Sequence, residues 1–361
     1  MPVRSRIDLL KRPILAVLSL TLYSGNSNRL PTVHVKYIPT ERPGIMSDSA
    51  EDPPILMPCW SGYSGEPFNL TERRPLNILG EADDTITANG FYYQGTFWKA
   101  IIPKRGVAEI FAQQFNFSKH KRQADGGSKP SIFFLNHVQA RVKMTPESAI
   151  ALYAASGDAN GEPVHRITDF CHSVEAVGPH GRSWNVADAL LGNLAVVHRF
   201  LSTTDVAFER IILSRMTVLQ SPPLPLEADI RDQLLCAAIR RSHDVGLTKP
   251  YFMARMSCRA ANCTSEPLNI VDDIRKAPPW QHFFHRLPIH PRSYLKVRGL
   301  WQDGKPTPTL NDEMADWLAS EEAKQRRAIH LQKKKELGDL PQAPKIPSWK
   351  NVSSFIRAIR A

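Results

Sequence analysis

The chain has 361 residues, of which 42% are apolar and 22% charged, with 29 prolines and a formal net charge of +11. This ordinary globular usage excludes a wholly disordered chain, and the length predicts one sizeable core with extensions. Residues 319–361 hold ten basic and four acidic side chains, a net charge of +6, so the remainder is only mildly basic. No nucleic-acid partner is expected.

Residues 1–27 have the features of an export signal. Arg4, Arg6, Lys11 and Arg12 precede the apolar run PILAVLSLTLY, and small polar residues follow it. An amphipathic or buried N-terminal helix is the alternative for this segment. No other apolar run approaches the roughly 18 to 20 residues of a membrane-spanning helix. We therefore expect an exported protein of the periplasm or cell envelope, soluble or peripheral once mature.

Residues 28–88 are rich in Pro, Gly and Ser without a sustained period, which predicts an irregular N-terminal extension. The catalytic domain is expected to span residues 89–318. Aromatic and β-branched residues predict a strand at 90–102, and alternation predicts further strands at 131–144 and 164–177. The strand at 131–144 places Phe133, Leu135, His137, Gln139 and Arg141 on one face.

Helical patterns follow these strands. A helix is predicted at 184–200, although Gly192 interrupts it, and an amphipathic helix at 227–241. A last core helix is expected directly after Cys263. Several prolines then predict an extended C-terminal strap, followed by a charged helix at 312–337 within a basic helical tail, residues 319–361.

The segment ANCTSEPLNIVDDI places Cys263 where a helix should begin, because Thr and Ser cap helices, Pro fits the first turn and Glu favours the positive helix end. The helix dipole and main-chain N–H groups at such a position stabilise a thiolate and lower the thiol pKa. The pattern therefore predicts a nucleophile, whose own main-chain N–H would be the first oxyanion donor.

Cysteine nucleophiles of the papain type need an imidazole to accept and return the thiol proton. Among twelve histidines, His137 is favoured because a predicted central strand carries it between Asn136 and Arg141. His120 falls in a basic loop and His330 in the charged tail. We therefore predict His137 as the general base.

Four segments carry a resemblance to a known family: SIFFLNHVQARVKM, DFCHSVEAVGPHGRSWNVADALLGNLAVVHRF, FERIILSRMTVLQSPPLPLE and ANCTSEPLNIV. In this order they resemble the bacterial DUF4105 family, also called the lipoprotein N-acyltransferase (Lnb) N-terminal periplasmic domain family, over residues 131–300. That family is similar to circularly permuted papain-like (NlpC/P60-like) enzymes, in which the His strand precedes the Cys helix. The resemblance implies His137 as imidazole and Cys263 as nucleophile, with Asn262 beside it.

The implied fold is α+β: a permuted papain-like, antiparallel sheet packed on helices, with the nucleophile at a helix N-terminus. The implied reaction is acyl transfer or hydrolysis on lipid or lipoprotein acyl groups or on peptide amides, without cofactor or metal. The sequence departs from the family in two respects. Tyr251 and Phe252 precede the Asn-Cys pair by about ten residues, and an apparent insertion brings Cys258 into the segment.

The third polar residue, which would orient the imidazole, stays open among Asp169, His172 and Glu175, because their strand is expected to adjoin the His137 strand. Other interpretations also remain. Cys258 could pair with Cys263, which would silence the site, and a zinc site can be drawn from Cys258, Cys263, His282 and His285. The gap between those two histidines is shorter than the usual zinc spacing.

Two classes of function are therefore carried forward. The first is a cysteine-dependent acyl-transfer enzyme acting on a lipid, a lipoprotein or a cell-wall peptide. The second is a catalytically silent envelope module that binds a lipid or peptide. In either case the basic tail is expected to contact an anionic membrane surface.

Overall fold

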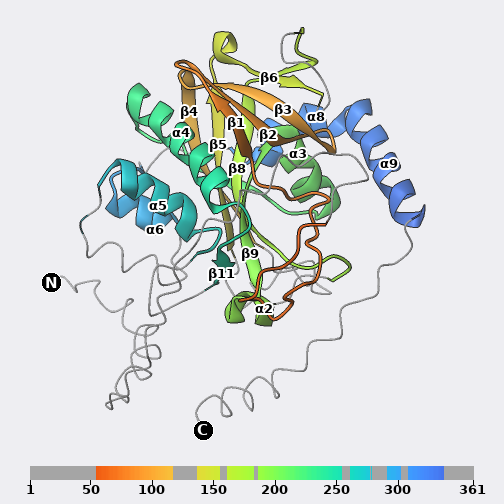
Figure 1. Cartoon of the computed structure of the whole chain (residues 1–361). Helices are drawn as coiled ribbons and strands as arrows, with labels where there is room; N and C mark the ends of the chain where they lie inside the picture. Colours follow the sequence, from red (N-terminus) through yellow and green to blue (C-terminus); the bar gives the residue numbers. More distant parts are fainter. Residues whose placement is uncertain are drawn as a thin grey trace, which may run out of the picture. The chain divides into compact units, whose positions relative to one another are not determined.

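The structure is a computed structural model that describes residues 54–116, 136–154, 161–182, 186–253, 261–276, 278, 291–301 and 308–336. The chain divides into two compact units, Met1–Met46 and Ser47–Ala361, and every described residue belongs to the second. Within the described ranges, eleven strands form one mostly antiparallel sheet that packs against helices (Figure 1). The predicted α+β class, an antiparallel sheet packed on helices, is confirmed.

The sheet has the order β10-β4-β5-β8-β9-β2-β3-β6-β7, with β1 beside β2 and β11 beside β9. Only β2 and β9 pair in parallel among these described strands. The strands are β1 Asn77–Glu81, β2 Thr85–Tyr93, β3 Thr96–Pro103, β4 Val107–Asn116, β5 Asn136–Met144, β6 Ile150–Tyr153, β7 His165–Ile167, β8 Asp169–Val177, β9 Leu194–Ser202, β10 Leu219–Gln220 and β11 Pro250–Tyr251.

Strand alternation gives the central strands two different faces. One, the apolar face, carries Val138, Ala140 and Val142 of β5 together with Phe170 of β8 and Phe200 of β9. It is covered by α4 (Ala228–Val245), α5 (Ser265–Ile274) and α6 (Pro291–Val297), whose Leu234, Leu235, Leu268, Ile270 and Leu295 belong to the same core cluster (Figure 1).

The opposite, polar face carries His137, Gln139 and Arg141 of β5 and Ser173 and Glu175 of β8, all of them buried. Cover on this side comes from α3 (Thr203–Val206), the π-helical segment η2 (Ala207–Leu213) and the C-terminal helices α7 (Leu310–Glu313), α8 (Ala315–Ala319) and α9 (Glu321–Glu336) (Figure 1).

Two predicted helices, at 227–241 and after Cys263, are confirmed as α4 and α5. The helix predicted at 184–200 is wrong. A short helix α2 (Val186–Leu191) stops before Gly192, whose φ of +76° lies in the left-handed region, and β9 follows. All nine residues of β9 are buried because helices cover both faces there, so its apolar run shows no strand alternation.

Other boundaries also differ from expectation. The strand predicted at 90–102 is the hairpin β2–β3, which turns at Gln94 and Gly95, and β1 lies inside the predicted irregular extension 28–88. The charged helix predicted at 312–337 is divided into α7, α8 and α9. The signal segment 1–27, the loop that holds His120 and residues 337–361 of the tail lie outside the described residues.

Candidate active site

Cys263 lies at the entry of α5, as predicted, and Asn262 fixes this entry. The side-chain Oδ1 of Asn262 accepts hydrogen bonds from the N–H groups of Thr264 (2.9 Å) and Ser265 (2.8 Å). Its Nδ2 donates to the carbonyl oxygens of Phe252 (3.1 Å) and Met253 (2.9 Å). Asn262 therefore caps the helix and ties it to the segment after β11, which sets the position of the neighbouring thiol.

The Cys263 thiol is buried against the main chain of β5. Its Sγ lies 3.7 Å from the carbonyl oxygen of Asn136, to which it donates, and it accepts from the hydroxyl of Tyr251 at 3.6 Å. The N–H of Val138 is a further donor to the sulfur. Burial raises the pKa of Cys263, and these hydrogen bonds only partly oppose the effect. The lowered pKa predicted from the helix N-terminus is wrong for this resting arrangement, because desolvation dominates.

His137 turns toward the polar face. Its ring stacks on Phe115 with centroids 4.7 Å apart, and Nε2 lies 2.8 Å from Oγ of Ser173. Ser173 donates its hydroxyl proton to Oε1 of Glu175 at 3.2 Å, so it must accept from the ring. The proton of the neutral imidazole is therefore on Nε2, and Nδ1 carries the basic lone pair. Burial, assisted by the charge of Arg210, lowers the pKa of His137 to about 3.

Glu175 is the centre of a buried ionic network. Nε of Arg73 lies 2.5 Å from its Oε2, while Arg210 and Arg199 lie 2.9 and 3.5 Å from its Oε1. Burial alone would raise the pKa of Glu175, but the charges of Arg210, Arg73 and Arg199 outweigh it and hold the pKa well below its usual range. Glu209, which makes two hydrogen bonds to Arg199, adds a second carboxylate.

The segment η2 places Arg210 and Glu209 in this network. It is a π-helix, a conformation that often occurs at functional sites. From this segment Arg210 contacts Glu175 of β8, and Glu209 contacts Arg199 of β9. Nothing in the sequence between 203 and 213 predicts this geometry, so Arg210 was missed, as was Arg73, which comes from the segment predicted to be irregular.

The three candidates for the residue that orients the imidazole have different partners in the structure. Glu175 is linked to the His137 ring through Ser173. Asp169 instead accepts two hydrogen bonds from Arg141 and one from Thr203. His172 lies on the apolar face. The S-x-E spacing of Ser173 and Glu175 is the sequence signal that could have found the relay, since alternation puts both on the face of His137.

His172 belongs to a second buried polar chain. Its Nε2 is 3.0 Å from Nδ1 of His198, and Nε2 of His198 is 3.6 Å from Oε2 of Glu266 on α5. Burial and the neighbouring His198 hold the pKa of His172 well below its ordinary value. His172 therefore stays neutral and does not contact His137 across the sheet.

His137 and Cys263 approach the same short stretch of β5 from different directions. The thiol contacts the main chain of Asn136 and Val138, on either side of His137, while the ring of His137 faces the polar side. Hydrogen bonds between described residues do not join the thiol to the imidazole. Proton transfer between them requires a change of side-chain rotamer or a small movement of the α5 entry.

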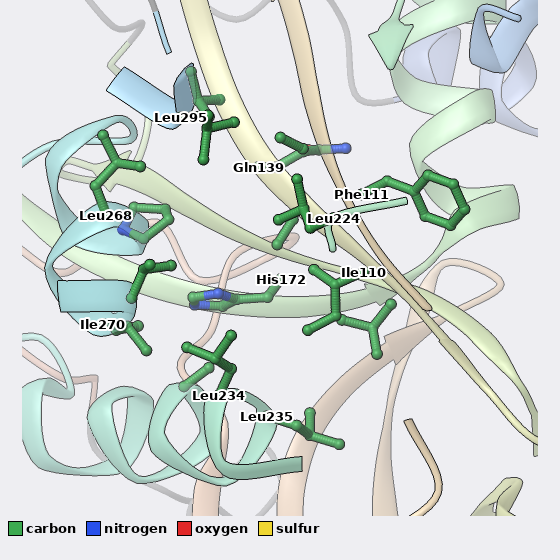
Figure 2. A pocket seen from close by; sticks show the side chains of 17 residues that line it. Ile110, Phe111, Gln139, His172, Leu224, Leu234, Leu235, Leu268, Ile270 and Leu295 are labelled. Carbon is green, nitrogen blue, oxygen red and sulfur yellow. The ribbon is translucent and has the colours of Figure 1, made fainter. Parts of the chain in front are cut away.

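An apolar cavity of about 80 Å³ lies between the sheet and α4, α5 and α6 (Figure 2). Figure 2 shows the ring of His172 between Leu268 and Ile270 of α5 and Leu234 of α4. Pro267 and Val271 of α5 also line the cavity. The helix that begins beside the thiol therefore forms one wall of an apolar space.

The metal and disulfide alternatives involve cysteine and histidine side chains on both described and undescribed segments. It contains no group of three or more His, Cys, Asp and Glu side chains that could hold a metal ion. Cys258, His282 and His285 lie outside the described residues. Cys263 is a free thiol, as are Cys59, Cys171 and Cys236.

No helix in the described ranges is long and apolar enough to cross a membrane. Comparisons with protein-family models, with curated proteins and with solved structures found no match to this chain.

Proposed function

We propose that this chain is a cysteine-dependent acyl-transfer or hydrolytic enzyme, with Cys263 as nucleophile and His137 as general base. One observation carries the proposal: the thiol at the entry of α5 lies against the β5 main chain on both sides of His137, whose ring is oriented by Ser173 and Glu175. A nucleophile, a base and a group that orients the base are the parts that covalent catalysis needs.

The proposed mechanism assigns one role to each residue. Nδ1 of His137 takes the proton of the Cys263 thiol as the sulfur attacks a carbonyl carbon, and Glu175, through Ser173, holds the imidazole in the Nε2–H tautomer. The imidazolium then protonates the leaving group. An amine or water attacks the acyl carbon and gives up its proton to His137. The C–S bond then breaks, the acyl product leaves, and the imidazolium returns its proton to the sulfur, which restores the thiol.

In the resting state the pair is a thiol and a neutral imidazole, because burial opposes both charges. The thiolate therefore forms only when substrate binding brings the two side chains together. The Tyr251 hydroxyl and the Val138 N–H, which already donate to the sulfur, stabilise the negative charge at that moment.

The apolar cavity behind α5 supports one class of substrate. Because Pro267 and Leu268 follow Cys263 closely and line the cavity, an acyl group attached to the sulfur would have an apolar surface within reach. This favours an apolar acyl group from a lipid or lipoprotein, with peptide amides as the other class. We also propose the permuted papain-like arrangement of the DUF4105 family, with the His137 strand ahead of the Cys263 helix.

For location, we propose export to the periplasm or cell envelope through residues 1–27, with peripheral membrane contact through the basic tail. Exposed lysines of α9, among them Lys333 and Lys335, support such contact. A non-catalytic module that binds lipid or peptide is the second candidate. It is favoured by the raised thiol pKa together with the apolar cavity.

Turnover of p-nitrophenyl acyl esters by matched variants tests the proposal. We expect Cys263→Ser and His137→Ala to lower kcat by at least roughly 100-fold, the size of effect associated with loss of a general base. Cys236→Ser, which changes another buried thiol, is the control and should keep wild-type turnover. Full activity of Cys263→Ser would reject the mechanism and leave the binding module as the better account.

A further inference from the structure

A small polar pocket of about 40 Å³ lies where β8 ends, just beyond Glu175. It is lined by Tyr63, Arg73, Arg182 and Asp188, together with residues 176–179 and Leu194. Unlike the cavity behind α5, this pocket is rich in charged side chains.

Arg73 lines this pocket and makes fewer hydrogen bonds than its guanidinium allows. Its Nε donates to Glu175, and this is its only hydrogen bond to another described residue. The side chain is 39% exposed, whereas its partner Glu175 is 5% exposed. The two terminal amino groups of the guanidinium therefore remain as donors for a ligand in the pocket.

The charge of the network leads to the same conclusion. Arg73, Arg199 and Arg210 face two carboxylates, Glu175 and Glu209, so one positive charge is in excess. Among these three arginines, Arg73 is the one that lines the pocket, so the network brings a positive charge to the pocket wall. Asp188 is the negative charge of the same wall.

The other charged groups of the pocket already have partners. One edge of the Arg182 guanidinium, Nε and one terminal amino group, donates to the Glu66 carboxylate at 3.1 and 3.0 Å. Asp188 accepts from the Tyr63 hydroxyl at 2.8 Å. Arg73 is thus the residue best placed to recognise an anion.

Two short residue paths connect the pocket to the proposed catalytic pair. Arg73 contacts Glu175, which leads through Ser173 to His137. Leu194 pairs with Tyr251, whose hydroxyl donates to Cys263. A ligand group on Arg73 would therefore be separated from His137 by the side chains of Glu175 and Ser173.

We infer that the pocket binds a carboxylate group of the substrate through the guanidinium of Arg73. That the bound molecule is a substrate rests on the proposed function. The binding of a carboxylate by Arg73 does not depend on it. A singly charged carboxylate fits better than a doubly charged phosphate, because Asp188 in the same wall repels each negative charge that enters the pocket. The planar guanidinium also matches the two oxygens of a carboxylate.

Ligand-observed NMR titration of the full chain carrying Cys263→Ser tests the inference without turnover. N-acetylglycine is the probe, and its neutral amide, N-acetylglycinamide, is the matched ligand. We expect saturable binding of the acid and at least roughly 10-fold weaker binding of the amide, as for loss of a hydrogen bond to a charged group. Methyl phosphate should bind no more tightly than the acid.

Two variants locate the binding. Arg73→Gln should weaken binding of the acid by roughly 10- to 100-fold. Arg73→Lys keeps the positive charge beside Glu175, and its affinity for the acid should fall several-fold. The neighbouring Arg74→Gln is the control, because Nε of Arg74 donates to the carbonyl of Leu70 and Arg74 does not line the pocket.

Equal binding of acid and amide, or unchanged binding in both Arg73 variants, would overturn the inference. Tighter binding of methyl phosphate would overturn the carboxylate class. If the wild-type chain forms no acyl-enzyme but the carboxylate binds as expected, the proposed function is wrong and the carboxylate site is still supported. Failure of the inference and failure of the proposed function therefore give different results.

Discussion

The buried ring of His137 makes stability depend on pH, and the size of the effect can be worked out. Burial and the charge of Arg210 lower the pKa of His137 from 6.5 to about 3. Since the unfolded chain then binds a proton more readily than the folded chain, the stabilisation is complete above pH 6.5 and is lost as pH falls toward 3. Each pH unit within this window costs about 1.4 kcal/mol.

Between pH 6.5 and 4.5 the loss from His137 alone is therefore about 3 kcal/mol. Replacement by glutamine keeps a donor for Ser173 but cannot take up the proton. The free energy of unfolding falls between pH 7.5 and pH 4.5 in both proteins. We expect this fall to be about 3 kcal/mol smaller in His137→Gln than in wild type. His172 and His198, whose pKa values are also lowered by burial, contribute equally to both proteins.

The assay is urea unfolding at the two pH values, followed by tryptophan fluorescence. His180→Gln is the matched control because its ring is exposed, and its pH dependence should follow wild type. If His137→Gln lost as much stability as wild type between the two pH values, His137 would not be held neutral by burial, and the account of the polar face would be wrong.

Three further results are expected. Asn262→Ala, which removes two cap bonds and two ties to carbonyl oxygens, should lower the free energy of unfolding by roughly 1–3 kcal/mol in chemical denaturation; a smaller loss would mean that the α5 entry is held elsewhere. Gly192→Ala should destabilise more than Gly181→Ala, because both have positive φ but a Cβ at Gly192 would lie 2.3 Å from the Phe252 ring while Gly181 has open space; equal melting temperatures would contradict this packing. Lys333→Glu with Lys335→Glu should weaken sedimentation with anionic vesicles by at least roughly 10-fold at low salt, at about 1 kcal/mol per charge; unchanged vesicle binding would exclude α9 as the membrane contact.

The elements that sequence could predict are those with a clear period. α4 and α5 were predicted because each shows one apolar stripe and a recognisable start, and β5 because polar and apolar side chains alternate along it. β9 could not be recognised in the same way. Buried on both faces, it has no alternation, and its apolar run resembles a helix until Gly192 is placed in the left-handed region.

The candidate site was predicted in part for a similar reason. Local patterns place Cys263 at a helix start and His137 on a strand, but they do not determine how deeply each is buried. The thiol pKa was therefore predicted in the wrong direction. Arg73 and Arg210 reach Glu175 from segments with no periodic signal, across separations of 102 and 35 residues. Contacts of this kind depend on the assembled sheet and on the π-helical segment.

The central claim, that Cys263 is a nucleophile, is tested most directly by trapping its acyl-enzyme. Wild-type protein would be mixed with a p-nitrophenyl acyl ester, quenched in acid within the first turnover, digested and analysed by mass spectrometry. The account predicts an added acyl mass on Cys263 that is absent from its peptide in Cys263→Ser, is strongly reduced in His137→Ala and persists in Cys236→Ser. An unmodified Cys263 in wild type while ester turnover proceeds, or acylation confined to another residue, would contradict it.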